Sequence, residues 1–144
     1  MKGTASGRLL TFPANKFPVE LVERNLHCFT GNGETPRRVF SSDQWSDYLI
    51  FRLYPRLRVF FDGRSDFYGP WRGRMYQRLM AGESDSTAVL DHENVELALV
   101  PNNWPLSGIL RSSPAWRVAS ADAQGVLFER TLIKSSAAAD RCAE

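Results

Sequence analysis

The chain has 144 residues, and 18 Lys and Arg stand against 16 Asp and Glu, which gives a formal net charge of +2. This length is typical of one domain, and so small a net charge gives no argument for nucleic-acid binding. No apolar run approaches the roughly 20 residues that cross a bilayer, and the segment before Pro18 lacks the apolar core of a signal peptide. We therefore expect a single domain, 17–133, between a loose N-terminal segment, 1–16, and a disordered tail, 134–144.

The charge is unevenly distributed along the chain. Nine Arg and four Asp lie between Arg37 and Arg78, whereas five acidic residues and no Lys or Arg lie between Glu83 and Glu96. This distribution fits either a dipolar, solvated surface or a basic half that faces an anionic ligand or a membrane headgroup layer. The sequence leaves both interpretations open.

The two cysteines, Cys28 and Cys142, are too few for a disulfide framework. Cys142 lies in the segment SSAAADRCAE, whose composition and terminal position are typical of a disordered tail. We therefore do not expect a bridge between the two cysteines.

The first half of the chain predicts a helix, a strand, a second helix and a second strand. Apolar residues recur with helical spacing from Pro18 to Leu26, and the strand RRVFS follows at 37–41. The next helix has capping side chains in SSD and ends near Pro55, which disfavours helical backbone in the residue before it. RVFFD at 58–62 is apolar on both faces, as in a strand buried in a parallel sheet.

The second half begins with GRSDFYG, which predicts a loop, and Pro70 then opens a helix that ends at Gly82. A further helix is expected at 85–93, a strand at 97–100 and a short helix capped by Asn103. The segment WRVASADAQGVLFER predicts two strands around a turn.

Strands that alternate with helices are typical of an α/β fold, here a layered α/β sandwich with a mostly parallel central sheet. We expect the strands at 38–41, 58–62 and 97–100 to be mutually parallel. The last two strands are expected to form a C-terminal antiparallel hairpin within 116–130.

Polar residues follow each of the three expected parallel strands: Asp43 after the first, Asp62, Arg64 and Asp66 after the second, Asn102 and Asn103 after the third. Ligands of open parallel sheets bind beyond the carboxyl ends of the strands, so these groups can form one cluster. Such a cluster can hold Mg²⁺ or Ca²⁺, with Arg64 binding an anion. Alternatively, the same side chains cap helices and organise loops.

The loop-organising interpretation makes a specific prediction for Asp62. This residue ends a buried strand, where an unpaired charge is costly, so a partner such as Arg64 or a loop N–H group is expected. Asp66 can accept hydrogen bonds from the N–H groups of Tyr68 or Gly69 and so prepare the helix at Pro70.

The stretch SSDQWSDYLIFRLYPRLRVFFDGRSDFYG resembles the soluble C-terminal domain that follows the multi-pass region of bacterial membrane proteins of the GT-C glycosyltransferase type. The resemblance extends from about Phe12 to Arg130, and DGRSDFYG is its more specific part. The matching residues are Phe17–Pro18, Val39–Phe40, Trp45, Tyr48–Ile50, Asp62–Arg64, Asp66, Tyr68–Gly69, Leu97–Val100, Trp104–Leu106, Trp116–Arg117 and Phe128–Arg130.

A more distant similarity connects Trp45, Asp47 and Tyr48 with the WWDYG motif of oligosaccharyltransferase catalytic subunits, which contacts the acceptor peptide. Ser46 and Leu49 depart from that motif at its second Trp and its Gly. The candidate ligand-binding or loop-organising residues are therefore Asp43, Trp45, Asp47, Tyr48, Asp62, Arg64, Asp66 and Tyr68.

The resemblance implies a non-catalytic accessory or recognition domain on the extracytoplasmic side of a bacterial membrane, because the catalytic carboxylates of that architecture lie in membrane-embedded loops. Its partners would be the membrane-embedded portion of its own protein and a glycan or an acceptor, with no nucleic acid and no cofactor. The alternative is a small stand-alone metal-dependent hydrolase or phosphoryl-transfer enzyme that uses Asp43, Asp62 and Asp66.

Overall fold

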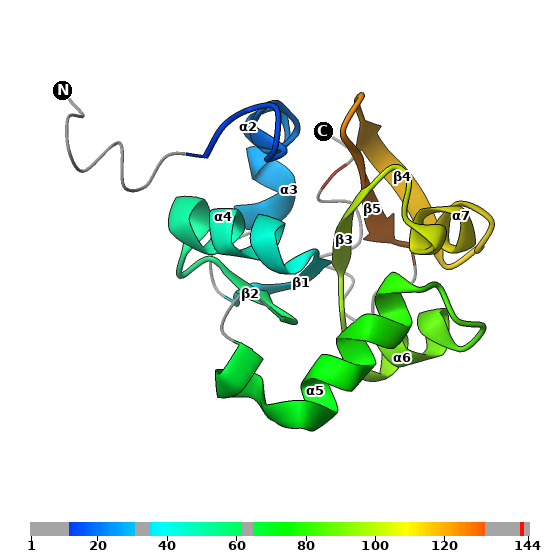
Figure 1. Cartoon of the computed structure of the whole chain (residues 1–144). Coiled ribbons are helices and arrows are strands. Elements are labelled where there is room, and N and C mark those ends of the chain that lie inside the picture. The colour runs from blue at the N-terminus through cyan, green and yellow to red at the C-terminus, as the bar shows by residue number, and fades with distance from the viewer. Residues whose placement is uncertain (1–11, 31–34, 62–64, 132–141, 143–144) are drawn as a thin grey trace, which may run out of the picture.

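The computed structural model describes residues 12–30, 35–61, 65–131 and Cys142, and of residues 65–68 it describes the backbone. Its centre is a five-stranded sheet with the strand order β2-β1-β3-β5-β4 (Figure 1). The strands are β1 (Arg37–Ser41), β2 (Leu57–Val59), β3 (Leu97–Pro101), β4 (Trp116–Ala121) and β5 (Gly125–Arg130).

The strand directions confirm the predicted mixed sheet. β1 pairs in parallel with β2 on one side and with β3 on the other, so that Val39 is the partner of both Val59 and Leu97. β5 is antiparallel to β3 and to β4, and the register between β4 and β5 shifts between Val118 and Ser120. The carboxyl ends of β1, β2 and β3 therefore lie at one edge of the sheet.

Helices cover both faces of the sheet, as expected for a layered sandwich (Figure 1). α2 (Val19–Arg24), α3 (Leu26–Thr30) and α4 (Asp43–Leu53) pack with one set of strand side chains, which includes Val39. α5 (Ser65–Met80), α6 (Ser86–His92) and α7 (Pro105–Arg111) pack with the other set, which includes Phe40. The two sets arise because successive strand side chains point to opposite faces.

Four element boundaries differ from the predicted ones. The first predicted helix divides at Asn25, whose side-chain amide donates to the Leu21 carbonyl at 2.8 Å and so competes with the helical ladder. The second strand is Leu57–Val59 and does not extend to position 62. Helical structure begins at Ser65 within the predicted loop, and Gly69, with a φ of 80°, interrupts it before Pro70. Trp104, and not Asn103, precedes the first turn of α7.

The structure also corrects the expectation for the cysteines, because Cys28 of α3 and Cys142 form a disulfide across a sequence separation of 114. The expectation rested on the composition of the tail, which carries no information on so distant a partner. The predicted segment 1–16 lies largely outside the described residues, but its described end packs on the domain: the Phe12 ring lies 4.9 Å from Phe17 and 5.1 Å from Tyr48. Within the described residues, no helix has both the length and the apolar character needed to cross a bilayer.

Candidate functional site

The carboxyl end of β1 is occupied by three polar residues that the fold itself uses. The Ser41 hydroxyl donates to the Leu99 carbonyl of the neighbouring strand at 2.6 Å. The Ser42 hydroxyl caps α4 by accepting from the Trp45 N–H at 3.2 Å. Asp43 lies in the first turn of α4, where a negative charge favours the helix dipole, and its own N–H donates to the Tyr76 hydroxyl at 2.9 Å.

Tyr76 belongs to α5, on the opposite face of the sheet from α4, and its hydroxyl extends to this edge. Its ring stacks on Phe61 at 4.6 Å between centroids and lies 5.9 Å from Phe40 and 6.3 Å from Trp104. Burial in this aromatic group raises the pKa of the Tyr76 phenol to about 12, because the charged form would lose its hydration. The place where a ligand of an open sheet would bind, beside β1 and β3, is thus filled by aromatic rings.

The polar residues after β3 are also engaged. The Asn102 side-chain amide donates to the carbonyls of Asp122 and Ala123 at 2.9 and 3.0 Å. The Asp122 carboxylate in turn accepts from the N–H groups of Gln124 and Gly125. These contacts fasten the turn between β4 and β5 to the end of β3.

The three residues of α4 that resemble the acceptor-binding motif point in different directions. Trp45 and Tyr48 lie three positions apart on the buried face, with exposed fractions of 7% and 4%, and the Trp45 indole N–H donates to the Lys16 carbonyl at 2.9 Å. Burial raises the pKa of Tyr48. Asp47 lies on the exposed face of α4. The fold therefore brings Trp45 and Tyr48 together in the core and turns Asp47 away from them.

The remaining predicted site residues belong to the DGRSDFYG segment. Asp62 and Arg64 lie outside the described residues, and Asp66 and Tyr68 fall in the first turn of α5, where the backbone alone is described. Among the side chains that the structure describes, no three from His, Cys, Asp and Glu come close enough together to hold a metal ion.

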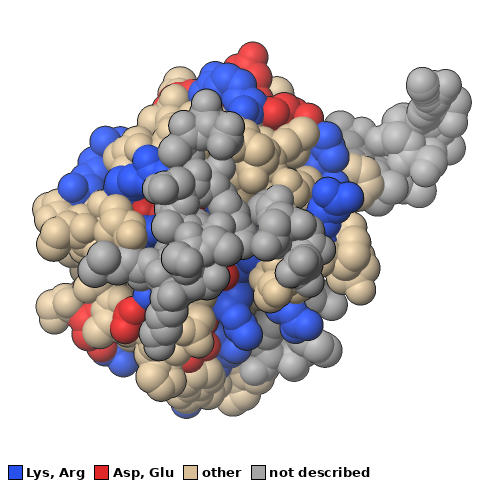
Figure 2. All heavy atoms as spheres, turned by 180° about the vertical axis from the view of Figure 1, so that it is seen from behind, with Lys and Arg blue, Asp and Glu red and all other residues tan. Residues whose placement is uncertain are grey.

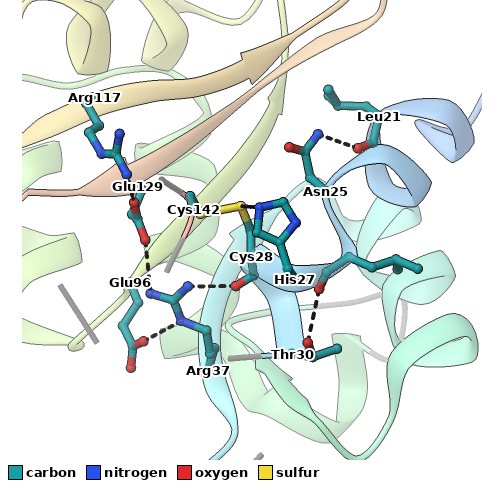
Figure 3. Close-up of a disulfide and its surroundings, with 11 residues drawn as sticks. Leu21, Asn25, His27, Cys28, Thr30, Arg37, Glu96, Arg117, Glu129 and Cys142 are labelled. Atoms are coloured by element: carbon teal, nitrogen blue, oxygen red, sulfur yellow. Dashed lines mark hydrogen bonds and ion pairs between the residues drawn. A yellow bond between two sulfur atoms is a disulfide. The ribbon is translucent and has the colours of Figure 1, made fainter. Parts of the chain in front are cut away.

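The opposite, amino-terminal edge of the sheet holds a buried ionic network that the sequence did not predict (Figure 3). Arg37 is fully buried, and its guanidinium donates to Glu96 at 2.8 Å and to the Cys28 carbonyl at 2.6 Å. Its third nitrogen lies 3.5 Å from the carboxylate of Glu129, which is also fully buried and pairs with Arg117. Figure 3 shows that the disulfide of Cys28 lies beside this network.

The sequence also did not predict a second group of charges, which lies close to the edge strand β2. Arg38, Arg58 and Arg72 line a small cavity together with Glu93. The excess of Arg between Arg37 and Arg78 was visible in the sequence. Which of these side chains meet depends on strand register and on the packing of α5, and neither follows from composition.

Comparisons with protein-family models, with curated proteins and with solved structures find no match to this chain.

Proposed function

We propose that this chain is a non-catalytic accessory or recognition domain of a glycosyltransferase-like membrane protein and works on the extracytoplasmic side of a bacterial membrane. In this proposal it contacts the membrane-embedded portion of its own protein and a glycan or an acceptor. The proposal starts from the resemblance of SSDQWSDYLIFRLYPRLRVFFDGRSDFYG described above.

One observation carries the non-catalytic part of the proposal, namely the use of the polar groups at the carboxyl edge of the parallel strands. An α/β enzyme places groups there that remain available to substrate. In this chain Ser41, Ser42 and Asn102 make hydrogen bonds within the fold, and the Tyr76 hydroxyl accepts the Asp43 N–H. The described groups at this edge therefore hold strands, helices and a turn together.

The disulfide supports the proposed location. Cys28 and Cys142 are bonded to each other, and disulfides form and persist mainly in oxidising compartments, which in bacteria lie outside the cytoplasm. Among the described residues, no observation favours the alternative of a metal-dependent enzyme that uses Asp43, Asp62 and Asp66.

A turnover assay tests the proposal. The purified chain is incubated with phosphate esters and with glycosides, with and without Mg²⁺ or Mn²⁺, and no product is expected under any condition. Metal-dependent hydrolysis that disappears in Asp62→Ala but persists in a variant of a distant surface residue, Arg24→Gln, would contradict the non-catalytic assignment.

A further inference from the structure

Strand register places two arginines side by side at the edge of the sheet. Arg38 of β1 and Arg58 of β2 are direct partners in the parallel pairing. Their neighbours two positions on, Phe40 and Phe60, lie in the core on the α5 side, with ring centroids 5.7 Å apart. Because side chains two positions apart in a strand share a face, Arg38 and Arg58 both lie on the α5 side.

A third arginine comes to the same place from α5. The Arg72 guanidinium lies over the Phe60 ring, with its central carbon 4.3 Å from the ring centroid, and donates to Glu93 at 3.0 Å. The aromatic face and the carboxylate both favour this position of the cation. Arg72 is therefore fixed against the strands, and less side-chain freedom is lost when it binds a further group.

The three arginines line a cavity of about 40 Å³ together with Val39, Val59, Phe60, Glu93 and Val95. A cavity needs roughly 10–15 Å³ on this measure to hold one water molecule. The space thus suits a group the size of a few water molecules, and it opens to solvent beside Arg38 and Arg58, which are exposed.

The charge in the cavity is not balanced by the described residues. Among the described residues, Glu93 is the one carboxylate that lines it, and Glu93 pairs with Arg72. Within the part of the chain that the structure describes, neither Arg38 nor Arg58 has an acidic partner. Like charges directly opposite each other on neighbouring strands destabilise a sheet, so a bound anion would relieve a repulsion that the register imposes.

The arrangement of the guanidinium groups indicates which anion fits. A planar carboxylate can be satisfied by a single arginine fork, whereas a tetrahedral phosphate offers oxygens in several directions to several forks. Here the forks come from three separate elements, β1, β2 and α5, around one small space. We propose that the Arg38–Arg58–Arg72 cavity is a binding site for a phosphate group, carried either by a soluble phosphate compound or by an anionic lipid headgroup.

The inference goes beyond the proposed function and does not depend on it, because a phosphate site can exist in a chain of any activity. Figure 2 shows the face turned away from Figure 1, where Lys and Arg form several separate groups among neutral and acidic side chains. A general attraction to anions would involve all such groups. A site in the cavity would depend on its own three arginines.

The test measures binding of the full chain to two probes. Inorganic phosphate is titrated in an NMR experiment that follows the arginine Nε–H signals, and co-sedimentation is measured with vesicles of phosphatidylglycerol and of phosphatidylcholine. We expect Arg38→Gln and Arg58→Gln each to weaken binding about tenfold, the loss that corresponds to one hydrogen bond to a charged group. Arg58→Lys, which keeps the charge but not the fork, is expected to weaken phosphate binding as well.

Arg78→Gln is the matched control, because it removes the same charge from α5 at a residue that already pairs with Glu83 and Asp85. Its affinity should stay within about twofold of the parent.

The two probes distinguish the source of the phosphate group. Binding to inorganic phosphate alone would identify a soluble phosphate compound, and binding to phosphatidylglycerol vesicles alone would identify a lipid headgroup. Binding to both supports the site with either source. No binding to either probe, or equal weakening in Arg78→Gln, would overturn the proposal. The turnover assay measures catalysis and not phosphate binding, so the proposed function and this site can fail independently of each other.

Discussion

Arg37 places a positive charge where there is no solvent, and three groups around it compensate for the lost hydration. Glu96 and the Cys28 carbonyl accept its hydrogen bonds, and the buried carboxylate of Glu129 lies 3.5 Å away. Cys28 lies in α3 and Glu129 in β5, so the charge group fixes β1, β5 and α3 relative to one another. A buried charge that loses its partner is far less stable than an exposed one.

Arg37→Met should lower the free energy of unfolding by about 3–5 kcal/mol, because it leaves the buried Glu129 short of a partner. Urea unfolding followed by circular dichroism measures the change. Arg52→Met is the control, since Arg52 forms an exposed pair with Glu23, and its loss should cost no more than about 1 kcal/mol. An Arg37→Met variant as stable as the parent would show that the network does not stabilise the fold.

Tyr76 gives the fold a dependence on alkaline pH. Its folded pKa, about 12, lies above the ordinary value of 10.0, so the phenol ionises first in the unfolded chain. The stabilising contribution is complete below pH 10 and is lost as the pH rises toward 12, by about 1.4 kcal/mol per pH unit. Tyr76→Phe should therefore lose less stability than the parent between these two pH values.

Urea unfolding at pH 9 and at pH 11.5 measures this difference. Tyr54→Phe serves as the matched control, because it makes the same substitution at a tyrosine that is 75% exposed. If Tyr76→Phe and the parent lose the same free energy, the phenol is not buried as the structure describes.

At the scale of helices and strands, most elements follow from local patterns, and the departures depend on backbone conformations that those patterns do not determine. The predicted helix at 85–93 appears as Ser86–His92 and the predicted strand at 97–100 as Leu97–Pro101. The interruption within α5 and the division between α2 and α3 depend on backbone angles at Gly69 and Asn25. Their residue types are compatible with either outcome, so the sequence could not decide between them.

Two glycines at different element positions should respond oppositely to the same substitution. A Cβ at Gly125, the first residue of β5, would lie 2.8 Å from the Val100 carbonyl oxygen and 2.9 Å from the buried Trp45 ring. Neither neighbour can move easily, so Gly125→Ala should destabilise the fold by about 1–3 kcal/mol.

Gly73 lies within α5, and a Cβ there would meet nothing within 4 Å. Gly73→Ala should therefore stabilise the fold by up to about 1 kcal/mol through higher helix propensity. Thermal melts of the two variants beside the parent measure both effects. A melting temperature that rises for Gly125→Ala, or falls for Gly73→Ala, would contradict the packing described at that position.

At the scale of the whole molecule, the sequence predicts the sheet topology better than it predicts the candidate site. Alternating strands and helices predicted the parallel strands and therefore the edge at which polar residues gather. The sequence could not show that Tyr76, 33 positions away, accepts the Asp43 N–H, or that Arg38 and Arg58 share a register position. Such contacts between distant segments decide whether a polar residue is free for a ligand.

The disulfide makes a prediction about where the whole molecule folds. In bacterial cells that express the complete reading frame, Cys28 and Cys142 should resist a membrane-permeable alkylating reagent until the protein is denatured and reduced, because a cysteine in a disulfide has no thiolate to react. Mass spectrometry of the two peptides measures the modification. Alkylation of both cysteines in intact cells without a reductant would contradict the proposed extracytoplasmic location.

That the fold itself closes the carboxyl edge of the parallel strands is tested most directly by hydrogen exchange at the Asp43 amide. This N–H donates to Tyr76, so it should exchange about as slowly as the Phe60 N–H, which donates to the Val39 carbonyl beside the sheet. In Tyr76→Phe the Asp43 exchange should become faster while the Phe60 exchange stays slow. If the Asp43 amide of the parent chain exchanges as fast as an unprotected amide, the group is free to bind a ligand, and the edge is an open site.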